Sequence, residues 1–174
     1  SDNTRAKSVL FDATLNFYTI SDDIIADTQL KELLQKDYAS VKDVRTACDC
    51  YNRLSFTLAN NASISSICVY TESPQFPTSG YIQRASTEQV QTWFEQVKVP
   101  GSVYWESSFT DRVGSESPEL TLVRSFPFTS AQRPAILVIR MSNNYLKNRI
   151  QNNQLFISVS LNQEPIFFSS QRSL

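Results

Sequence analysis

The chain has 174 residues and a formal net charge of -1, with 41% hydrophobic and 11% aromatic residues. This composition is enough to fill the core of one domain and argues against disorder. Lysine, arginine, aspartate and glutamate are scattered singly, so no basic face is available to neutralise phosphates and we expect no nucleic-acid binding by this segment. The longest aliphatic run, Ala135 to Ile139, is far shorter than the roughly 20 residues that cross a bilayer, and we expect the 174-residue segment to be soluble.

The histidine and cysteine content restricts the possible chemistry. The chain has no histidine, which excludes a Ser-His-Asp triad, a Cys-His pair, an HExxH site and the usual zinc sites. Cys48 and Cys50 lie two apart in a helical pattern and point in different directions, so they cannot easily form a bridge. Cys68, within an apolar strand pattern, is expected to be a small buried residue. We therefore predict no disulfide scaffold, no metal site, no catalytic residue and no cofactor.

Helical periodicity runs through residues 1–63, which we predict to form an N-terminal helical arm. One apolar stripe consists of Leu10, Ala13, Phe17 and Ile20. The segment from Ser21 to Asp23 interrupts this stripe, which resumes at Leu30 after a potential helix cap at Asp27. A second, longer helix is predicted from a capping-box signature at Ser40 to the asparagines at 60 and 61. We expect the arm to pack along the sheet and the helix that carries Trp93 as one core.

Residues 64 to 146 contain the predicted sheet. The stretch ISSICVYTESPQFPTSGYIQ is typical of an extended hairpin, and STEQVQTWFEQV of a short amphipathic helix with capping residues Ser86 and Gln89. Three antiparallel strands are predicted at 103–105, 120–126 and 135–141, with a polar loop from Asp111 to Pro118. This order is typical of a half-open sheet with a pocket on one face, which favours a binding module.

Two arginines fall on otherwise apolar strand faces. Arg124 is in phase with Leu122 and Phe126, and Arg140 is in phase with Val138. A buried guanidinium needs a partner, so each arginine is a candidate to grip a ligand carboxylate, phosphate or hydroxyl. The alternative is that each arginine forms an internal salt bridge, or that its aliphatic side chain extends far enough for the guanidinium to reach water. Arg124 is the preferred polar anchor, and we expect Arg124→Ala to abolish binding and leave the fold intact.

Aromatic residues near these arginines could form the stacking wall of a pocket, especially for a sugar. The candidate ligand-binding aromatics are Tyr70, Trp93, Phe94, Tyr104 and Trp105. Aromatics at these spacings also fill cores, and Tyr104 and Trp105 point to opposite faces of their strand, so only one can line a given pocket. We expect the pocket between the Trp93 helix, the loop from Ser73 to Gly80 and the inner strand faces, on the side that the long helix leaves uncovered.

These segments together resemble a known family. The series SICVYT, SG, TWFEQ, GSVYW, ELTLVRSF and AILVIRMSNNYL is similar to the extracytoplasmic Cache sensor domain of membrane-anchored receptors. The most similar variant is that of the YesM-like sensor histidine kinases and the membrane-anchored AraC-type regulators of Gram-positive bacteria. LKELLQKDYAS and the helix ending LANNASISSI extend the likeness over nearly the whole chain. The resemblance implies an α+β, PAS-like Cache fold, with an antiparallel sheet of about five strands behind a long N-terminal helix that runs up from a first membrane span.

Two features bear on how far the resemblance extends. Cache receptors that bind amino acids have an Arg before a Trp-Tyr pair and an Asp in the last strand, whereas here Gln91 and Thr92 precede Trp93 and Phe94, and Arg140 stands where that Asp would be. Amino-acid recognition is therefore not implied. By resemblance, residues 64–154 form the sensing module with a linker helix, NNYLKNRIQNNQ. Residues 155–174 resemble the start of a second, membrane-proximal module, or fold back as an extra hairpin.

We therefore expect an extracytoplasmic ligand-sensing domain of a two-component histidine kinase, and not an enzyme within this segment. The alternatives are the sensor domain of an AraC-type regulator, a pilin-like or adhesin structural domain, and an enzyme that uses carboxylate or lysine chemistry. The resemblance implies a small-molecule ligand, with a carbohydrate as leading candidate, or a ligand-loaded binding protein, and a homodimeric receptor. Since the chain starts at Ser1 without a leader, we expect a segment of a longer membrane-anchored protein, on the extracellular side of the bacterial plasma membrane.

Overall fold

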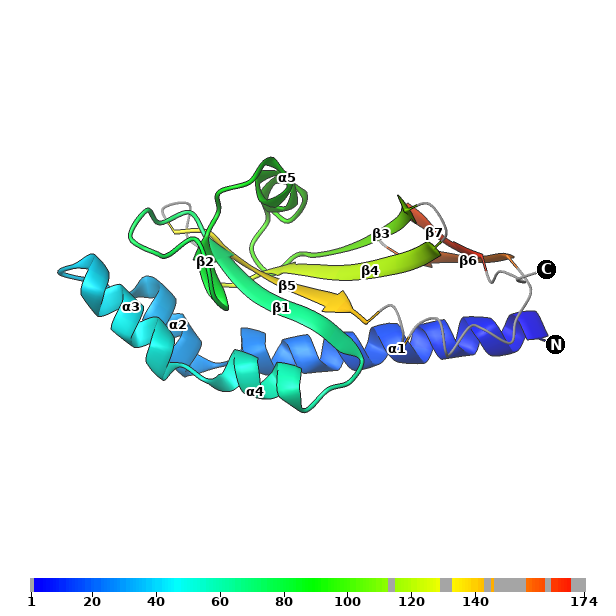
Figure 1. Cartoon of the computed structure of the whole chain (residues 1–174), viewed down its shortest axis with the longest axis horizontal. Helices are drawn as coiled ribbons and strands as arrows, with labels where there is room; N and C mark the ends of the chain where they lie inside the picture. Colours follow the sequence, from blue (N-terminus) through cyan, green and yellow to red (C-terminus); the bar gives the residue numbers. More distant parts are fainter. Residues whose placement is uncertain are drawn as a thin grey trace.

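The structure is a computed structural model that describes residues 2–112, 115–128, 133–142, 145, 156–161 and 164–169 (Figure 1). Its helices are α1 (Asp2–Ile25), α2 (Thr28–Gln35), α3 (Val41–Cys50), α4 (Arg53–Ala59) and α5 (Glu88–Gln96). Its strands are β1 (Ile64–Thr71), β2 (Ile82–Arg84), β3 (Val103–Arg112), β4 (Ser115–Ser125), β5 (Ala135–Met141), β6 (Phe156–Leu161) and β7 (Glu164–Ser169). Helices and strands are therefore both present, as predicted for an α+β chain.

Helix α1 is continuous through the polar residues that were expected to interrupt it. The Ser21 hydroxyl is fully buried and donates to the Tyr18 carbonyl one turn earlier, at 2.6 Å. Asp22 forms an ion pair with a strand residue on the sheet. Because both polar side chains are satisfied without leaving the helical conformation, the predicted interruption at Ser21 to Asp23 is wrong, and the helix ends at Ile25.

The caps of the next two helices agree with the prediction, but the length of the second helix does not. The Asp27 carboxylate accepts from the N–H of Gln29 at 3.0 Å, and the Ser40 hydroxyl accepts from the N–H of Asp43 at 3.2 Å. The single helix predicted after Ser40 is divided into α3 and α4, because Tyr51 is extended between them. The Tyr51 hydroxyl donates to Asp27 at 2.6 Å, which anchors this break to the start of α2.

The main sheet has the strand order β2-β1-β5-β4-β3, and it is mixed. β5 pairs antiparallel with both β1 and β4, and β4 pairs antiparallel with β3. β2 pairs parallel with β1, with Val69 opposite Ile82. The predicted hairpin from Ile64 onward, and the all-antiparallel sheet, are therefore wrong. The connection between β1 and β2 turns back along the edge of β1, so the second strand runs in the same direction as the first.

The β3 and β4 strands extend well beyond their predicted bounds. They remain paired to Arg112 and Ser115, with Asp111 opposite Glu116. The polar loop predicted from Asp111 to Pro118 is therefore mostly strand. Helix α5 also begins one residue later than predicted, since the Thr87 hydroxyl accepts from the N–H of Val90 at 3.3 Å, and Ser86 is not the cap.

The sheet lies between two unequal helical layers (Figure 1). The helices α1 to α4 lie on one face, where Phe17, Leu30, Val44 and Leu54 share a core with strand residues such as Leu122. Helix α5 lies on the other face and forms a separate, smaller core. Its members are Val90, Trp93, Phe94, Val97, Val123, Ile136 and Val138. The arm packs on the sheet as predicted, but it does not share a core with the Trp93 helix, because the sheet separates the two.

At the end of the molecule where α1 begins, β6 and β7 pair antiparallel into a two-stranded sheet of their own (Figure 1). The predicted linker helix at 143–154 lies outside the described residues except for Tyr145. Whether residues 155–174 start a second module stays a prediction. Within the part of the chain that the structure describes, no helix combines the length and apolar character needed to span a membrane.

Candidate ligand-binding face

The seven predicted site residues are divided between the two faces of the sheet. Alternation along the strands places Trp105 and Arg124 on the face that α1 covers, together with Leu122. The other five belong to the face that carries α5, which we call the α5 face. They are Tyr70, Trp93, Phe94, Tyr104 and Arg140. A single pocket cannot contain all seven, and of the pair Tyr104 and Trp105 it is Tyr104 that lies on the α5 face.

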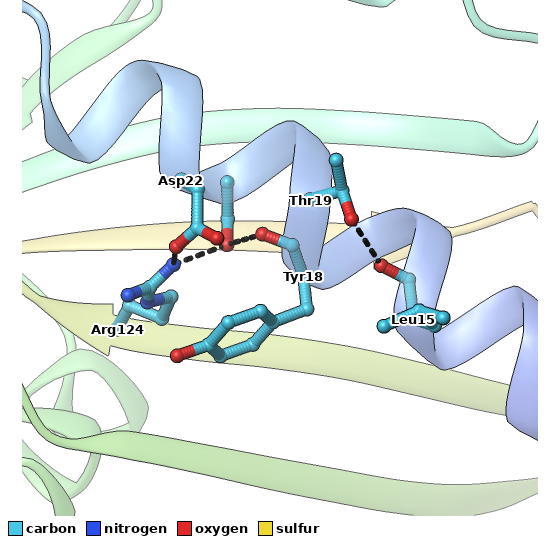
Figure 2. Close-up of polar contacts among 6 residues, drawn as sticks. Leu15, Tyr18, Thr19, Asp22 and Arg124 are labelled. Atoms are coloured by element: carbon cyan, nitrogen blue, oxygen red, sulfur yellow. Dashed lines mark hydrogen bonds and ion pairs between the residues drawn. The ribbon is translucent and has the colours of Figure 1, made fainter.

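Arg124 is not a free ligand anchor. Its Nη1 donates to Asp22 Oδ1 at 2.5 Å and to the Ser21 hydroxyl at 2.8 Å, both from α1 (Figure 2). Its guanidinium also lies 4.4 Å from the centroid of the Tyr18 ring. The side chain is buried, and the alternative of an internal salt bridge therefore applies. The prediction of an unpaired anchor is wrong because its partner is about a hundred residues away in sequence.

Trp93 occupies the centre of the α5 face. Its indole is 2% exposed, and its Nε1 donates to Glu106 Oε2 of β3 at 2.7 Å. The Arg140 guanidinium of β5 lies 5.4 Å from the centroid of the same ring, and the Tyr70 ring of β1 is tilted against it at a centroid distance of 6.4 Å. One indole thus contacts side chains from three strands.

Strand register extends this cluster into a row of polar residues. Ser66 is opposite Arg140, Arg140 is opposite Thr121, and Thr121 is opposite Glu106. Residues opposite each other in antiparallel strands share a face, so these four form one line across β1, β5, β4 and β3, which we call the polar row. The next row toward α5 contains Val138, and it belongs to the small core. The polar row is therefore the boundary between the apolar contact with α5 and the rest of this sheet face.

Arg140 differs from three other arginines of the described chain, because those three form ion pairs and it does not. The ion pairs among the described side chains are Arg53 with Asp27, Arg124 with Asp22, and Arg133 with Asp37. Arg140 is half-buried, and its guanidinium has neither an ion-pair nor a hydrogen-bond partner among the described residues. The cation–π contact with the Trp93 ring is the side-chain interaction that the described residues give this guanidinium. Because an arginine stays protonated, this charge is permanent.

Burial is the main influence on the two titratable neighbours of Arg140. It raises the pKa of the Cys68 thiol to about 11 and that of the Tyr70 hydroxyl to about 12. The positive charge of Arg140 acts in the opposite direction on both groups. Both side chains are therefore neutral at physiological pH and can offer a thiol and a hydroxyl, but no negative charge, to the guanidinium.

The loop from Ser73 to Gly80 lines a different cleft. Pro77, Ser79 and Gly80 face residues of α3 and α4 across a cleft of about 590 Å³, which also contains Arg45 and Tyr81. This cleft is at the β1–β2 edge, among residues that belong to the helical arm and its neighbouring loop. The lining of this cleft includes no residue of the Trp93 helix, whereas we predicted one pocket between that helix and the loop.

Glu106, Thr121 and Ser66 were not predicted as site residues. Glu106 follows Tyr104 at strand spacing, so the sequence carried the signal for its face but not for its hydrogen bond to Trp93. Among the described residues, no group of histidine, cysteine, aspartate or glutamate side chains could hold a metal ion. No family model matches the chain, and no curated protein is significantly similar to it. The α5 face therefore has to be interpreted from its own chemistry.

Proposed function

We propose that the chain is an extracytoplasmic sensing module of the PAS-like Cache type, and that the α5 face receives its ligand. Three features support this proposal: a five-stranded sheet, a long N-terminal helix behind it, and a short helix on the opposite face. The sequence resemblance implies the first two features for such a receptor, although with an all-antiparallel sheet, whereas β2 here pairs parallel with β1. The output module would be a histidine kinase, or a DNA-binding regulator of the AraC type.

The observation that carries the proposal is the state of Arg140. Three other arginines of the described chain are paired with aspartates, whereas Arg140 is half-buried over Trp93 without a carboxylate among the described residues. Burying a charge without a partner is costly, and a protein that retains such a group often uses it to bind. Arg140 also sits in the polar row, at the edge of α5. It is thus available to a ligand placed beside the helix.

A signal from this face has a direct route to the long helix. Strand β4 carries Val123 in the small core with Trp93, and its next residue, Arg124, is bound to Asp22 of α1. A ligand that moves β4 or α5 therefore changes the position of a side chain that holds α1. In a receptor dimer, a few kcal/mol of differential binding between two helix positions would be enough to change the output.

Two measurements test the proposal. The first is a thermal-shift screen of sugars, amino acids and organic acids against the chain and against Arg140→Gln, since a ligand at 100 times its dissociation constant adds about 2.7 kcal/mol of stability. The second fuses residues 1–174 to the membrane span and kinase of a characterised receptor and follows reporter output as the same compounds are added. A stabilising compound that changes the output supports the sensor. Concentration-dependent polymerisation without ligand, or turnover of a compound, contradicts it.

A further inference from the structure

The cleft at the β1–β2 edge of the sheet, which we call the edge cleft, lies away from the α5 face. It has a volume of about 590 Å³ and is bounded by the second half of α3, the start of α4 and the loop that leads into β2. Ligand pockets in proteins usually have volumes of about 300–1,000 Å³. The edge cleft is therefore large enough for a molecule of one or two rings.

The loop before β2 forms one wall of the edge cleft. Because β2 runs parallel to β1, the chain returns along the edge of β1 and passes through Ser79, Gly80 and Tyr81 to reach β2. Gly80 has a φ of +95°, in the left-handed region that glycine favours. A Cβ added there would meet no atom within 4 Å beyond its chain neighbours. This part of the wall therefore borders open space, not packed side chains.

Two tyrosines line the edge cleft, one from each wall. Tyr51 is half-buried, and its hydroxyl donates to Asp27 at 2.6 Å, which holds its ring in position. Tyr81 is 41% exposed, and its hydroxyl has no partner among the described residues. Within the described part of the chain the two rings make no contact with each other. Ile82, which is 3% exposed, adds apolar surface, so the cleft offers aromatic and aliphatic contacts to a ring.

The polar groups of the edge cleft are of both hydrogen-bonding kinds. Arg45 offers donors, Asp49 offers acceptors and the Asn52 amide offers both. Arg45 and Asp49 lie one turn apart on α3, yet neither forms an ion pair with the other or with another described side chain. Asn52 precedes α4 without capping it through its side chain. A ligand whose groups both donate and accept can use all three residues.

The charges of the lining favour an uncharged ligand. One guanidinium and one carboxylate cancel in net charge, and the Cys48 thiol is neutral because burial raises its pKa to about 11. An anion is attracted by Arg45 and repelled by Asp49, and a cation is attracted and repelled in the reverse sense, so neither gains a net advantage. Hydroxyl groups donate and accept without a charge to desolvate. A ring that carries several hydroxyls therefore suits this lining.

We propose that the edge cleft is a second binding site and that it takes a neutral, polyhydroxylated ring of the size of a mono- or disaccharide. The hydroxyls of this ligand bind Arg45, Asp49 and Asn52, and the apolar face of its ring lies against Tyr81. This inference does not depend on the proposed function, which places a ligand at Arg140 on the α5 face. The lining of the edge cleft includes no residue of α5.

Resonances from the two regions show where a sugar binds. Cellobiose, maltose and lactose are each titrated into the isotopically labelled chain. The Gly80 backbone N–H and the Asn52 side-chain amide report on the edge cleft, and the Trp93 indole N–H reports on the α5 face. We expect at least one disaccharide to give saturable millimolar shifts at Gly80 and Asn52 and none at Trp93. Sorbitol, which has hydroxyls but no ring, should bind at least about tenfold more weakly, which corresponds to about 1.4 kcal/mol.

Variants test the ring contact and the charge balance separately. Tyr81→Ala should weaken disaccharide binding about tenfold, or about 1.4 kcal/mol, whereas Tyr81→Phe keeps the ring and most of the affinity. Phe56→Ala removes a ring that is 66% exposed on α4 outside the cleft, and it should change nothing. Neither glucuronate nor glucosamine should bind the unchanged chain more tightly than glucose. Asp49→Asn should give glucuronate the advantage, and Arg45→Gln should give it to glucosamine.

Several outcomes would overturn the proposal. The site is refuted if no disaccharide gives a saturable shift at Gly80, if the shifts occur at Trp93 instead, or if Tyr81→Ala binds as tightly as the unchanged chain. The neutral ligand class is refuted if a charged sugar binds the unchanged chain at least about tenfold more tightly than glucose, or about 1.4 kcal/mol. Arg140→Gln should leave disaccharide binding intact, and its loss would place the ligand on the α5 face.

Discussion

Removal of the Asp22 carboxylate should destabilise the fold through the arginine that it leaves behind. In Asp22→Ala, the Arg124 guanidinium stays buried. Among the described residues it keeps its hydrogen bond to the Ser21 hydroxyl and its cation–π contact with the Tyr18 ring. Breaking a fully buried ion pair costs about 3–5 kcal/mol, and an exposed one contributes about 0–1 kcal/mol. The Arg124 side chain is 8% exposed but that of Asp22 is 52% exposed, so we expect an intermediate loss of about 1–3 kcal/mol.

A double-mutant cycle separates this cause from general damage to α1. The Nε atom of Arg124 is buried without a hydrogen-bond partner among the described residues, so Arg124→Met removes an incompletely satisfied charge and should cost less than Asp22→Ala. Once Arg124 is absent, Asp22→Ala should cost about 0.5 kcal/mol or less. The assay is urea unfolding of the four proteins, with free energies from linear extrapolation.

The neighbouring carboxylate provides the control. Asp23 is exposed on the same turn of α1 and has no ion-pair or hydrogen-bond partner among the described residues. Asp23→Ala should therefore change the free energy of unfolding by about 0.5 kcal/mol or less. If Asp22→Ala costs no more than Asp23→Ala, or costs the same with and without Arg124, the pair does not hold α1 to the sheet and the reasoning is refuted.

Three further predictions concern the arm and the thiols. Asp27→Ser keeps a helix cap but loses the acceptor for the Tyr51 hydroxyl, and should cost about 1–3 kcal/mol in urea unfolding, whereas Asp27→Ala should cost about 1 kcal/mol more. Burial raises the pKa of Cys68 from 9.0 to about 11, so the free energy of unfolding should fall as the pH rises from 9 through 11, by about 2–3 kcal/mol. At neutral pH, a thiol reagent should modify the exposed Cys50 before the partly buried Cys48 and Cys68.

Each of these predictions has an outcome that contradicts it. Equal losses for Asp27→Ser and Asp27→Ala would show that the cap contributes nothing measurable. The alkaline loss should be smaller in Cys68→Ala, because the folded protein holds the thiol proton more tightly than the unfolded chain; an unchanged pH dependence would exclude Cys68 as the cause. Modification of Cys68 as fast as that of Cys50, read by mass spectrometry, would contradict its burial.

Local signals predicted the parts of the fold that depend on neighbouring residues. The capping oxygens of Asp27 and Ser40 act within three residues, and both helices start where these side chains indicate. Alternation correctly placed Arg124 with Leu122 on one face, because side chains alternate along a strand whatever covers it. Alternation could not predict the partner of Arg124, because that partner is Asp22 of α1, and the packing of α1 on this face is a contact between residues about a hundred positions apart.

The errors in the sheet have a related cause. The Asp111 to Pro118 region is polar, and its pairing within β3 and β4 comes from registry with a partner strand and not from its own hydrophobicity. The pairing direction of β1 and β2 depends on the path of the connecting loop, which turn-forming residues alone do not determine. On the α5 face, the sequence marked Arg140 and Trp93 as candidates, and their role in binding stays a prediction. The hydrogen bond of Glu106 to Trp93 depends on a contact between α5 and β3 that no local pattern encodes.

The position of β5 in the middle of the sheet has a consequence for the order of folding. Before Ala135 to Met141 is in place, β1 with β2 and β4 with β3 are two separate half-sheets, and β1 and β4 each have an unpaired edge. The β3–β4 pairing is local in sequence, whereas β1 pairs with a strand about 70 residues later, a step that is slow because a long loop must close. A ribosome-bound chain that ends before residue 135 should therefore expose two adhesive edges and aggregate when released, and insertion of the last central strand should complete both halves in one cooperative step.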